Sequence, residues 1–432
     1  MRKLVTLLIT IACVLTMAAS SRNEMKADMD GLSKCDVIIF HDNTNKERNA
    51  LLIKDLKYLK KELPRRHKNL FFHISKKKFN KEIDQLIAKV DQLDNAKIYT
   101  RLNQIIASIG DAHTTINTWD GYRYPLQFYI FNGQVCVVDA DVSLKEMMNS
   151  QVTKIDGVDI DKITKELTTL IPHENEGWVR AMLPSYLQSP VYMYRLGLIK
   201  EEGKAVFTVE KDGKEKEFTV TAFDDSMSVD NINKKTKDVL IGRFDQYYTY
   251  QYIAEQKAVY FEYNICGETD KLKFADFNKE LFQTIENNDT KKIIVDLRNN
   301  SGGNSEILNP FTQQLSSYIK KNPELKVYII VGRKTFSSGM FAIYRIKESA
   351  PEAVSIGETT GGSLDHYGDI QYFSLPNSQM SLSYSTKHFE FSKLFAYKNE
   401  GVHEFLPDKL IQPTIQDYEN GIDPVLEYAF AN

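Results

Sequence analysis

The sequence of 432 residues contains only four cysteines and no excess of charge of one sign. So few cysteines in a chain of this length exclude a disulfide scaffold. The 55 Lys and Arg residues nearly balance 58 Asp and Glu residues, and a formal net charge of −3 excludes a supercharged nucleic-acid binder. The contents of 42% hydrophobic and 26% charged residues exclude a disordered or collagen-like chain. At about 150 residues per domain, two to three domains are expected.

Long hydrophobic runs are also missing, with one short exception at the N-terminus. Arg2 and Lys3 precede the apolar run Leu4–Ala18, and the small residues Ala18-Ala19-Ser20-Ser21 follow. The run falls short of the ~20 residues that span a bilayer, and Cys13 lies inside it rather than at a lipoprotein cleavage site. We therefore expect residues 1–20 to be a signal peptide. The mature protein would be secreted or exposed at the cell surface, without a stable membrane span.

Three cysteines remain after this cleavage: Cys35, Cys136 and Cys266. An odd number leaves at least one free thiol. Cys136 and Cys266 lie in or beside apolar runs typical of strands, so they are expected to be buried small hydrophobic residues rather than catalytic groups.

Residues 21–118 are predicted to form a helical N-terminal domain. In the segment FNKEIDQLIAKVDQL, apolar residues recur at spacings of three and four, as on one face of a helix. Between Lys54 and Lys81, eleven basic residues face two acidic ones. This charge of 11 − 2 = +9 fits either a solvated helix face or contact with an anionic partner.

Residues 121–222 are predicted to form a β-rich module. Two hairpins turn at Asn132-Gly133 and Asp212-Gly213, and a helix begins after Val158-Asp159. The module resembles a PDZ domain, which captures a peptide C-terminus as an added strand. The binding loop of such domains is rich in glycine, whereas this chain has Pro125, which lacks an N–H donor. Carboxylate capture and a purely packing role both remain open.

Residues 235–432 alternate between strands and helices. The runs AVYFEYNI, KKIIVDL and KVYIIVG are typical of buried strands, and helical segments lie between them. This alternation predicts an α/β core.

Three segments carry residues suited to catalysis. The segment VDLRNNSGG ends in Gly302 and Gly303, whose N–H groups could face a ligand, but it lacks the lysine of a phosphate-binding P-loop. In the segment TFSSG, a serine at a strand-to-helix turn suits either a nucleophile or a helix N-cap. His113 follows an apolar helix, where a lone histidine is either structural or catalytic.

These segments, with IGETTGG and the closing stretch LPDKLIQPTIQDYENGIDPVLEYAF, resemble the C-terminal processing peptidases, also called tail-specific proteases. The resemblance extends over residues 60–432. It implies an α/β fold, with a ClpP/crotonase-like catalytic core, a PDZ-like module and a helical N-terminal part.

The family has two catalytic designs. One uses a Ser–Lys dyad, but Ser363 stands where that lysine would be. The other design, found in the branch similar to the tricorn core and to retinoid-binding proteins, takes a histidine from a G-D-G-H-T segment. The segment Gly110-Asp111-Ala112-His113-Thr114 resembles it with one change. The resemblance therefore implies Ser337 as nucleophile, with Ser338 as its competitor, and His113 as general base.

The resemblance also implies the remaining site residues. The N–H groups of Ser338 and of Gly302 or Gly303 would form the oxyanion hole. Glu400 would orient the histidine, with Glu404 as the alternative. We expect Asp296 and Arg298 to stabilise the glycine turn rather than to react.

Together these features predict an exported serine-type endopeptidase that acts on proteins or peptides. No cofactor, metal or nucleic acid is expected, and the oligomeric state stays open. The alternative is a catalytically silent ligand- or peptide-binding protein of the same fold. Crotonase-like thioester chemistry is disfavoured by export, since coenzyme A is cytoplasmic.

Overall fold

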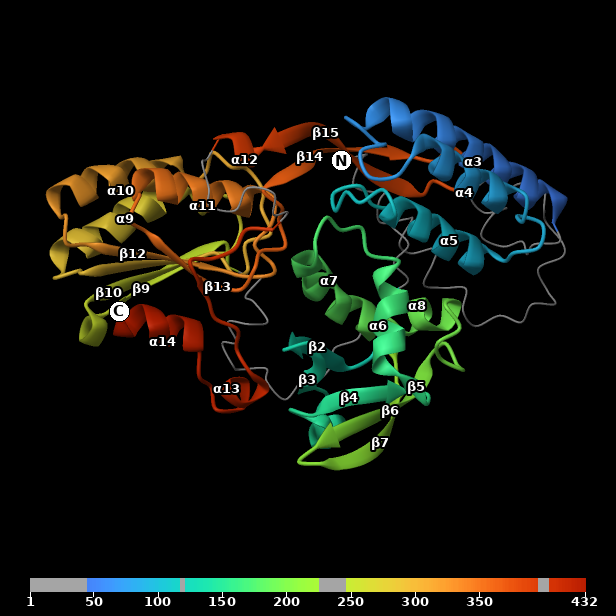
Figure 1. The fold of residues 1–432 in the computed structure, drawn as a ribbon, viewed down its shortest axis with the longest axis horizontal. Coiled ribbons are helices and arrows are strands. Elements are labelled where there is room, and N and C mark those ends of the chain that lie inside the picture. The colour runs from blue at the N-terminus through green and yellow to red at the C-terminus, as the bar shows by residue number, and fades with distance from the viewer. Residues whose placement is uncertain (1–44, 117–120, 225–245, 395–403) are drawn as a thin grey trace.

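The computed structural model describes residues 45–116, 121–224, 246–394 and 404–432. The predicted signal peptide, Cys35 and Glu400 lie outside these ranges. A helical part, a β-rich module and an α/β core surround the centre of the molecule (Figure 1). No helix within the described ranges combines the length and the apolar character needed to cross a membrane.

The helical part contains three helices, each begun by a side-chain cap: α3 (Lys46–Arg66), α4 (Lys76–Ile87) and α5 (Asn95–Ala107). They share a core with a hairpin from far along the chain, made of β14 (Asp365–Ser374) and β15 (Ser381–Glu390) (Figure 1). The buried Asp55 of α3 accepts hydrogen bonds from the backbone of Asn377 at 3.0 Å and of Ser378 at 2.7 Å. The hairpin therefore belongs to the helical layer, although it lies within the range predicted for the α/β core.

The β-rich module is built on a sheet in the order β2-β3-β4-β6-β7, with β5 paired to β4. Both predicted hairpin turns are present, and the predicted helix is α6. The stretch between this helix and β6 forms two more helices. The module's elements are β1 (Tyr122–Arg123), β2 (Leu126–Phe131), β3 (Gln134–Ala140), η1 (Val142–Met147), β4 (Gln151–Ile155), β5 (Val158–Asp159), α6 (Ile160–Thr168), α7 (Glu176–Gln188), α8 (Pro190–Arg195), β6 (Lys204–Lys211), β7 (Lys214–Thr221) and β8 (Phe223–Asp224).

The α/β core is built on a sheet in the order β16-β13-β12-β11-β10-β9, parallel except for β9. Alternate side chains of β11 enter different clusters, Ile293 and Val295 on the face of α9–α11 and Ile294 on the face of α14 (Figure 1). Burial on both faces explains the continuous apolar strands. The core's elements are β9 (Tyr248–Ile253), η2 (Ala254–Gln256), β10 (Ala258–Tyr263), α9 (Phe274–Asn287), β11 (Lys292–Asp296), α10 (Asn309–Lys321), β12 (Lys326–Val331), α11 (Ser338–Ser349), β13 (Val354–Gly357), α12 (Phe391–Leu394), β16 (Lys409–Leu410), α13 (Ile415–Glu419) and α14 (Pro424–Ala431).

The two cysteines within the described ranges have the surroundings predicted for them. Cys136 and Cys266 are free and buried, and burial raises their thiol pKa to about 12 and about 11. Thiols with such pKa values stay protonated and inert near neutral pH.

In the basic segment, Lys54, Lys57 and Lys61 are exposed along α3, as a solvated helix face requires. Contact with an anionic partner stays a prediction.

Candidate active site

Ser337 lies in the turn between β12 and α11, and its surroundings fix this turn firmly. The Thr335 hydroxyl donates to the carbonyl of Leu297 at 2.8 Å, and the N–H of Phe336 donates to the carbonyl of Asn300 at 2.9 Å. Ser337 has φ = 52° and ψ = −122°, a conformation that a residue with a Cβ rarely adopts. Backbone strain of this kind persists where the surrounding structure enforces it, and it is common at reactive positions.

The two serines of this turn have different hydrogen-bonding roles. Ser337 is the N-cap residue of α11 by position, but its side chain makes no capping hydrogen bond. The Ser338 hydroxyl donates to the carbonyl of Gly303 at 2.6 Å. The geometry therefore favours Ser337 as the nucleophile and gives Ser338 a structural hydroxyl.

The glycine turn packs directly against Ser337. A Cβ atom on Gly302 would stand 2.7 Å from the Cβ of Ser337 and 3.0 Å from the N of Ser338. The Gly302 N–H itself donates to Oδ1 of Asn300 at 3.0 Å. Within the described residues, the N–H groups of Gly303 and Ser338 have no acceptor. Of the three predicted oxyanion donors, these two are available to a substrate, whereas the N–H of Gly302 is already engaged.

His113 lies just beyond α5, in a segment organised by the buried carboxylate of Asp111. One oxygen of Asp111 accepts the N–H of His113 at 2.9 Å. The other lies 2.8 Å from Nε2 of His67 and accepts the hydroxyls of Thr114 at 2.6 Å and Ser385 at 2.7 Å.

The imidazole of His113 lies next to the nucleophile turn. Its ring stacks on that of Phe336 with centroids 4.6 Å apart, and its Nδ1 lies 3.8 Å from Oδ1 of Asp111. His113 and Ser337 line one cavity of about 760 Å³. No hydrogen bond joins either ring nitrogen of His113 to Ser337. The cavity thus brings the predicted base and nucleophile together without a bond between them, a looseness common in enzymes without substrate.

The electrostatics of this region keep the histidine neutral and the aspartate ionised. Burial lowers the pKa of His113, against the opposing charge of Asp111. Burial acts to raise the pKa of Asp111, but the bond from His67, the His113 charge and the two hydroxyls lower it to about 2. Burial, followed by the charge of His113, lowers the pKa of the neighbouring His366 to about 4. A neutral imidazole beside a carboxylate is suited to accept a proton.

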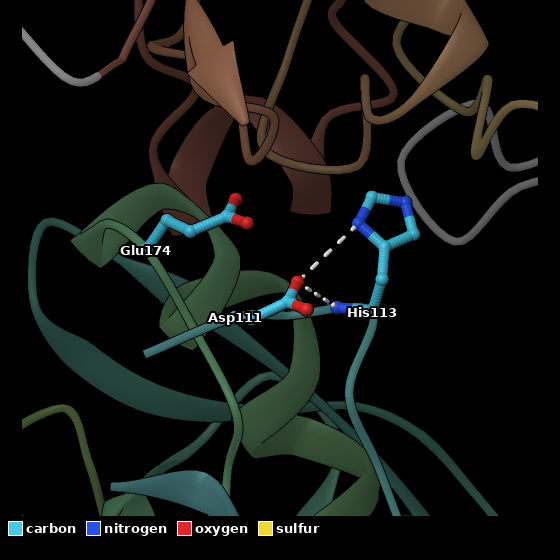
Figure 2. Close-up of side chains that lie close together, drawn as sticks. All are labelled: Asp111, His113 and Glu174. Atoms are coloured by element: carbon cyan, nitrogen blue, oxygen red, sulfur yellow. Dashed lines mark hydrogen bonds and ion pairs between the residues drawn. The ribbon is translucent and has the colours of Figure 1, made fainter. Parts of the chain in front are cut away.

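A second carboxyl group, Glu174, also lies in this cluster. Figure 2 shows Glu174, Asp111 and His113 together, and their potential metal-ligand atoms lie within 4.8 Å of one another. Burial, followed by the charge of Asp111, raises the pKa of Glu174 well above its usual value. Asp111 already accepts four hydrogen bonds, and both carboxyl groups lie close enough to His113 to influence its proton affinity.

The remaining predicted positions within the described residues are Glu404, Ser363, Asp296 and Arg298. Glu404 is half-buried and forms a backbone bridge with Ser363. The Ser363 hydroxyl accepts a hydrogen bond from the amide of Asn175 at 3.0 Å, so it has a structural role. Asp296 and Arg298 form the expected ion pair, with Oδ2 and Nη2 2.7 Å apart.

Sequence reasoning missed His67, Glu174 and His366, which surround His113 and Asp111. His67 follows α3, Glu174 belongs to the β-rich module and His366 to β14. No local motif marks them, because each reaches the site only through the three-dimensional packing.

No protein-family model matches the sequence, and no curated protein matches it either. Among solved structures, the chain is similar to mature CPAF complexed with lactacystin, with a TM-score of 0.61 and 13% identity over 88% of this chain and 97% of that one. A second structure of mature CPAF gives a TM-score of 0.60 and 13% identity over 88% of this chain and 96% of that one. The photosystem II D1 C-terminal processing protease gives a TM-score of 0.40 and 12% identity over 84% and 92%.

Identities this low establish the fold alone. The likeness to CPAF confirms the predicted α/β core accompanied by a β-rich module and a helical N-terminal part. The similarity of the module to PDZ domains stays a prediction.

Proposed function

We propose that the chain is an exported serine-type endopeptidase, with Ser337 as nucleophile and His113 as general base. The observation that carries this proposal is the strained Ser337, whose hydroxyl makes no capping bond and which shares a cavity with a buried histidine beside an ionised aspartate. The fold it shares with mature CPAF and the sequence resemblance to C-terminal processing peptidases support the same assignment.

In the proposed mechanism, His113 takes the proton from Ser337 as the serine oxygen attacks a peptide carbonyl. The carbonyl oxygen becomes negative and is held by the N–H groups of Ser338 and Gly303, each worth about 3 kcal/mol in such sites. His113 then gives its proton to the leaving amine, and a water molecule hydrolyses the acyl-enzyme by the same route. The negative charge of Asp111 stabilises the imidazolium that forms on His113.

The missing bond between His113 and Ser337 is also compatible with a second function, ligand or peptide binding without hydrolysis. A small closing movement on substrate binding would complete the base–nucleophile pair in a peptidase. A binding protein would need no such movement.

A fluorophosphonate probe, which labels activated serines, separates the two functions. We expect labelling of the wild type, none of Ser337→Ala, and labelling of His113→Ala at least about 10³-fold slower, since loss of the base removes most of the activation. Ser338→Ala is the matched control. It should keep labelling within about tenfold, because it loses one structural hydrogen bond worth about 1 kcal/mol.

Absence of labelling in the folded wild-type protein from pH 5 to pH 9 would overturn the peptidase proposal in favour of binding. Loss of labelling in Ser338→Ala but not in Ser337→Ala would reassign the nucleophile. Export is tested separately by N-terminal sequencing of the mature protein, which should begin close to Ser21.

A further inference from the structure

We infer that a cationic groove beside the catalytic cavity binds an acidic side chain of the substrate, with Arg180 as its main specificity determinant. The inference rests on the proposed peptidase function and adds a substrate class: peptides with Asp or Glu a few residues from the scissile bond.

The groove is a cavity of about 540 Å³ that lies between the β-rich module and the α/β core. One wall is formed by β2 and α7, and the other by core residues near Asn299 and Arg333. Among the described residues, four cationic side chains and no acidic side chain line it. They are Arg123, Arg180, Arg333 and Lys334.

Arg180 differs from Arg333 in how its charge is balanced. Arg333 forms a buried ion pair with Glu358, with its Nε 2.8 Å from a carboxylate oxygen, so its charge is already matched. Arg180 donates from Nη2 to the neutral hydroxyl of Thr359 at 2.6 Å. Its Nε is buried without a partner among the described residues. Among the described residues no carboxylate pairs with Arg180, which lines the groove, so its guanidinium can form a charge-assisted hydrogen bond with a ligand carboxylate.

The wall that carries Arg180 is fixed before any ligand binds. The amide of Gln188, at the end of α7, donates to the carbonyl of Leu126 in β2 at 2.5 Å. At the other end of the helix, Asn175 donates to the carbonyl of Gly361 at 3.0 Å. A Cβ on Gly177 would stand 2.2 Å from the carbonyl oxygen of Thr360. The helix is thus docked at both ends, and little ordering is needed for recognition.

The groove continues into the catalytic cavity, since Trp178 and Ser301 line both. The Trp178 ring stacks on that of Phe336, next to the nucleophile, with centroids 3.9 Å apart. One extended peptide could therefore occupy both cavities, with its scissile bond at Ser337 and an acidic side chain at Arg180. β2 lies at the edge of its sheet, where such a peptide can run alongside it.

The test uses the mature protein and a pool of synthetic peptides with amidated C-termini. Each set places Asp, Asn or Lys at one position of a common neutral sequence, and mass spectrometry gives the cleavage sites and kcat/KM. At one position relative to the cleavage site, we expect Asp to exceed Asn by about tenfold or more, mainly through KM, and Lys to be the poorest. Arg180→Gln should reduce the Asp-to-Asn ratio of kcat/KM to within about twofold of one, and this ratio is independent of any uniform change in rate.

Arg195→Gln is the matched control, because Arg195 ends α8 of the same module and does not line the groove. It should keep the full preference for Asp. Cleavage of Asp and Asn peptides at equal rates by the wild type would overturn this inference and leave the peptidase proposal intact. So would a preference that appears only with free C-termini, since the groove would then bind the terminal carboxylate.

A binding measurement separates failure of this inference from failure of the proposed function. Fluorescence anisotropy with labelled Asp and Asn peptides is measured on the wild type and on Arg180→Gln. Without hydrolysis, a preference for Asp that Arg180→Gln removes would support the groove and contradict the peptidase. Equal binding of both peptides by the wild type would contradict the groove.

Discussion

The turn that carries Ser337 is fixed by neighbours within the α/β core, whereas the segment that carries His113 is fixed by contacts from separate parts of the chain. Around Ser337, the bonds to Leu297 and Asn300 join two loops at the ends of adjacent parallel strands. Around His113, Asp111 bonds to His67 and to Ser385, which lies 274 positions away.

The position of Ser337 thus depends on contacts within one core, whereas the position of His113 depends on packing between distant parts of the chain. Ser337 is presented by a strand, a glycine turn and a helix of the α/β core. By contrast, His113 is in place only when the N-terminal helices and the β14–β15 hairpin have packed together. The proposed catalytic pair would therefore form late in folding, since its base depends on contacts distant in sequence.

The largest effect is expected from breaking the histidine segment with Asp111→Asn. The substitution removes the charge beside His113 and leaves a donor where His67, Thr114 and Ser385 need an acceptor. We expect kcat/KM to fall by about 10²–10³, less than the ~10⁴ of a directly bonded triad aspartate, because Asp111 lies 3.8 Å from Nδ1. Unmet hydrogen bonds should also cost about 1–3 kcal/mol in the free energy of unfolding, measured in urea.

Asp55→Asn provides the control for that loss of stability. Asp55 is equally buried and also joins the helical part to the hairpin, through Asn377 and Ser378. Asp55→Asn should lower the free energy of unfolding by about as much as Asp111→Asn does, while the folded protein keeps its activity. If both variants lose activity in proportion to stability, Asp111 has a structural role only.

A smaller but still large effect is expected from Gly302→Ala. This substitution disturbs the turn that carries Ser337 and leaves the His113 segment unchanged. Its Cβ would collide with Ser337 and Ser338, and its φ of 109° disfavours any side chain. Because displacements near 1 Å cost about 10²-fold in rate, kcat/KM should fall by about that factor. Gly213→Ala is the control, since Gly213 has a φ of 72° and nothing within 4 Å of an added Cβ. Equal activity of the two variants would show that the close approach of Gly302 is not needed.

The same contrast explains what the sequence could predict. The buried strands, the two hairpins and the position of Ser337 follow from short patterns, and the structure shows the strands and turns expected. His113 was identified through its resemblance to a family segment. Nothing local indicates that β14 and β15 pack with the N-terminal helices, because that contact depends on pairs such as Asp55 and Asn377, 322 positions apart.

The acid beside the histidine marks the limit of prediction from sequence. The resemblance favours Glu400 over Glu404, because Asn399-Glu400-Gly401-Val402 is more similar to the family's segment, and Glu400 lies outside the described residues. Asp111, only two residues from His113, provides the carboxylate that the described structure brings closest to its ring. Glu174 comes from the β-rich module and could be found only from the folded chain.

The smallest effect is expected from Glu174→Gln, and it is best measured as a pH profile. Burial lowers the pKa of His113, and activity needs the neutral ring, so kcat/KM should rise with pH, with a midpoint below 6.5, and stay level from pH 7 to 8. The titratable groups around His113 are His67, Asp111, Glu174 and His366.

Because burial raises the pKa of Glu174 well above its ordinary value, the neutral carboxylic acid is favoured, and the neutral amide of glutamine resembles that form. We therefore expect Glu174→Gln to change kcat/KM by less than about threefold and to leave the midpoint within about half a pH unit, since no charge is removed. Glu176→Gln, on the exposed start of α7, is the control and should change neither. If Glu174 were ionised, its removal would lower the pKa of His113 and move the acid limb to lower pH. A downward shift of the midpoint by about one pH unit would thus show that Glu174 is ionised, like Asp111. The β-rich module would then supply a negative charge beside His113.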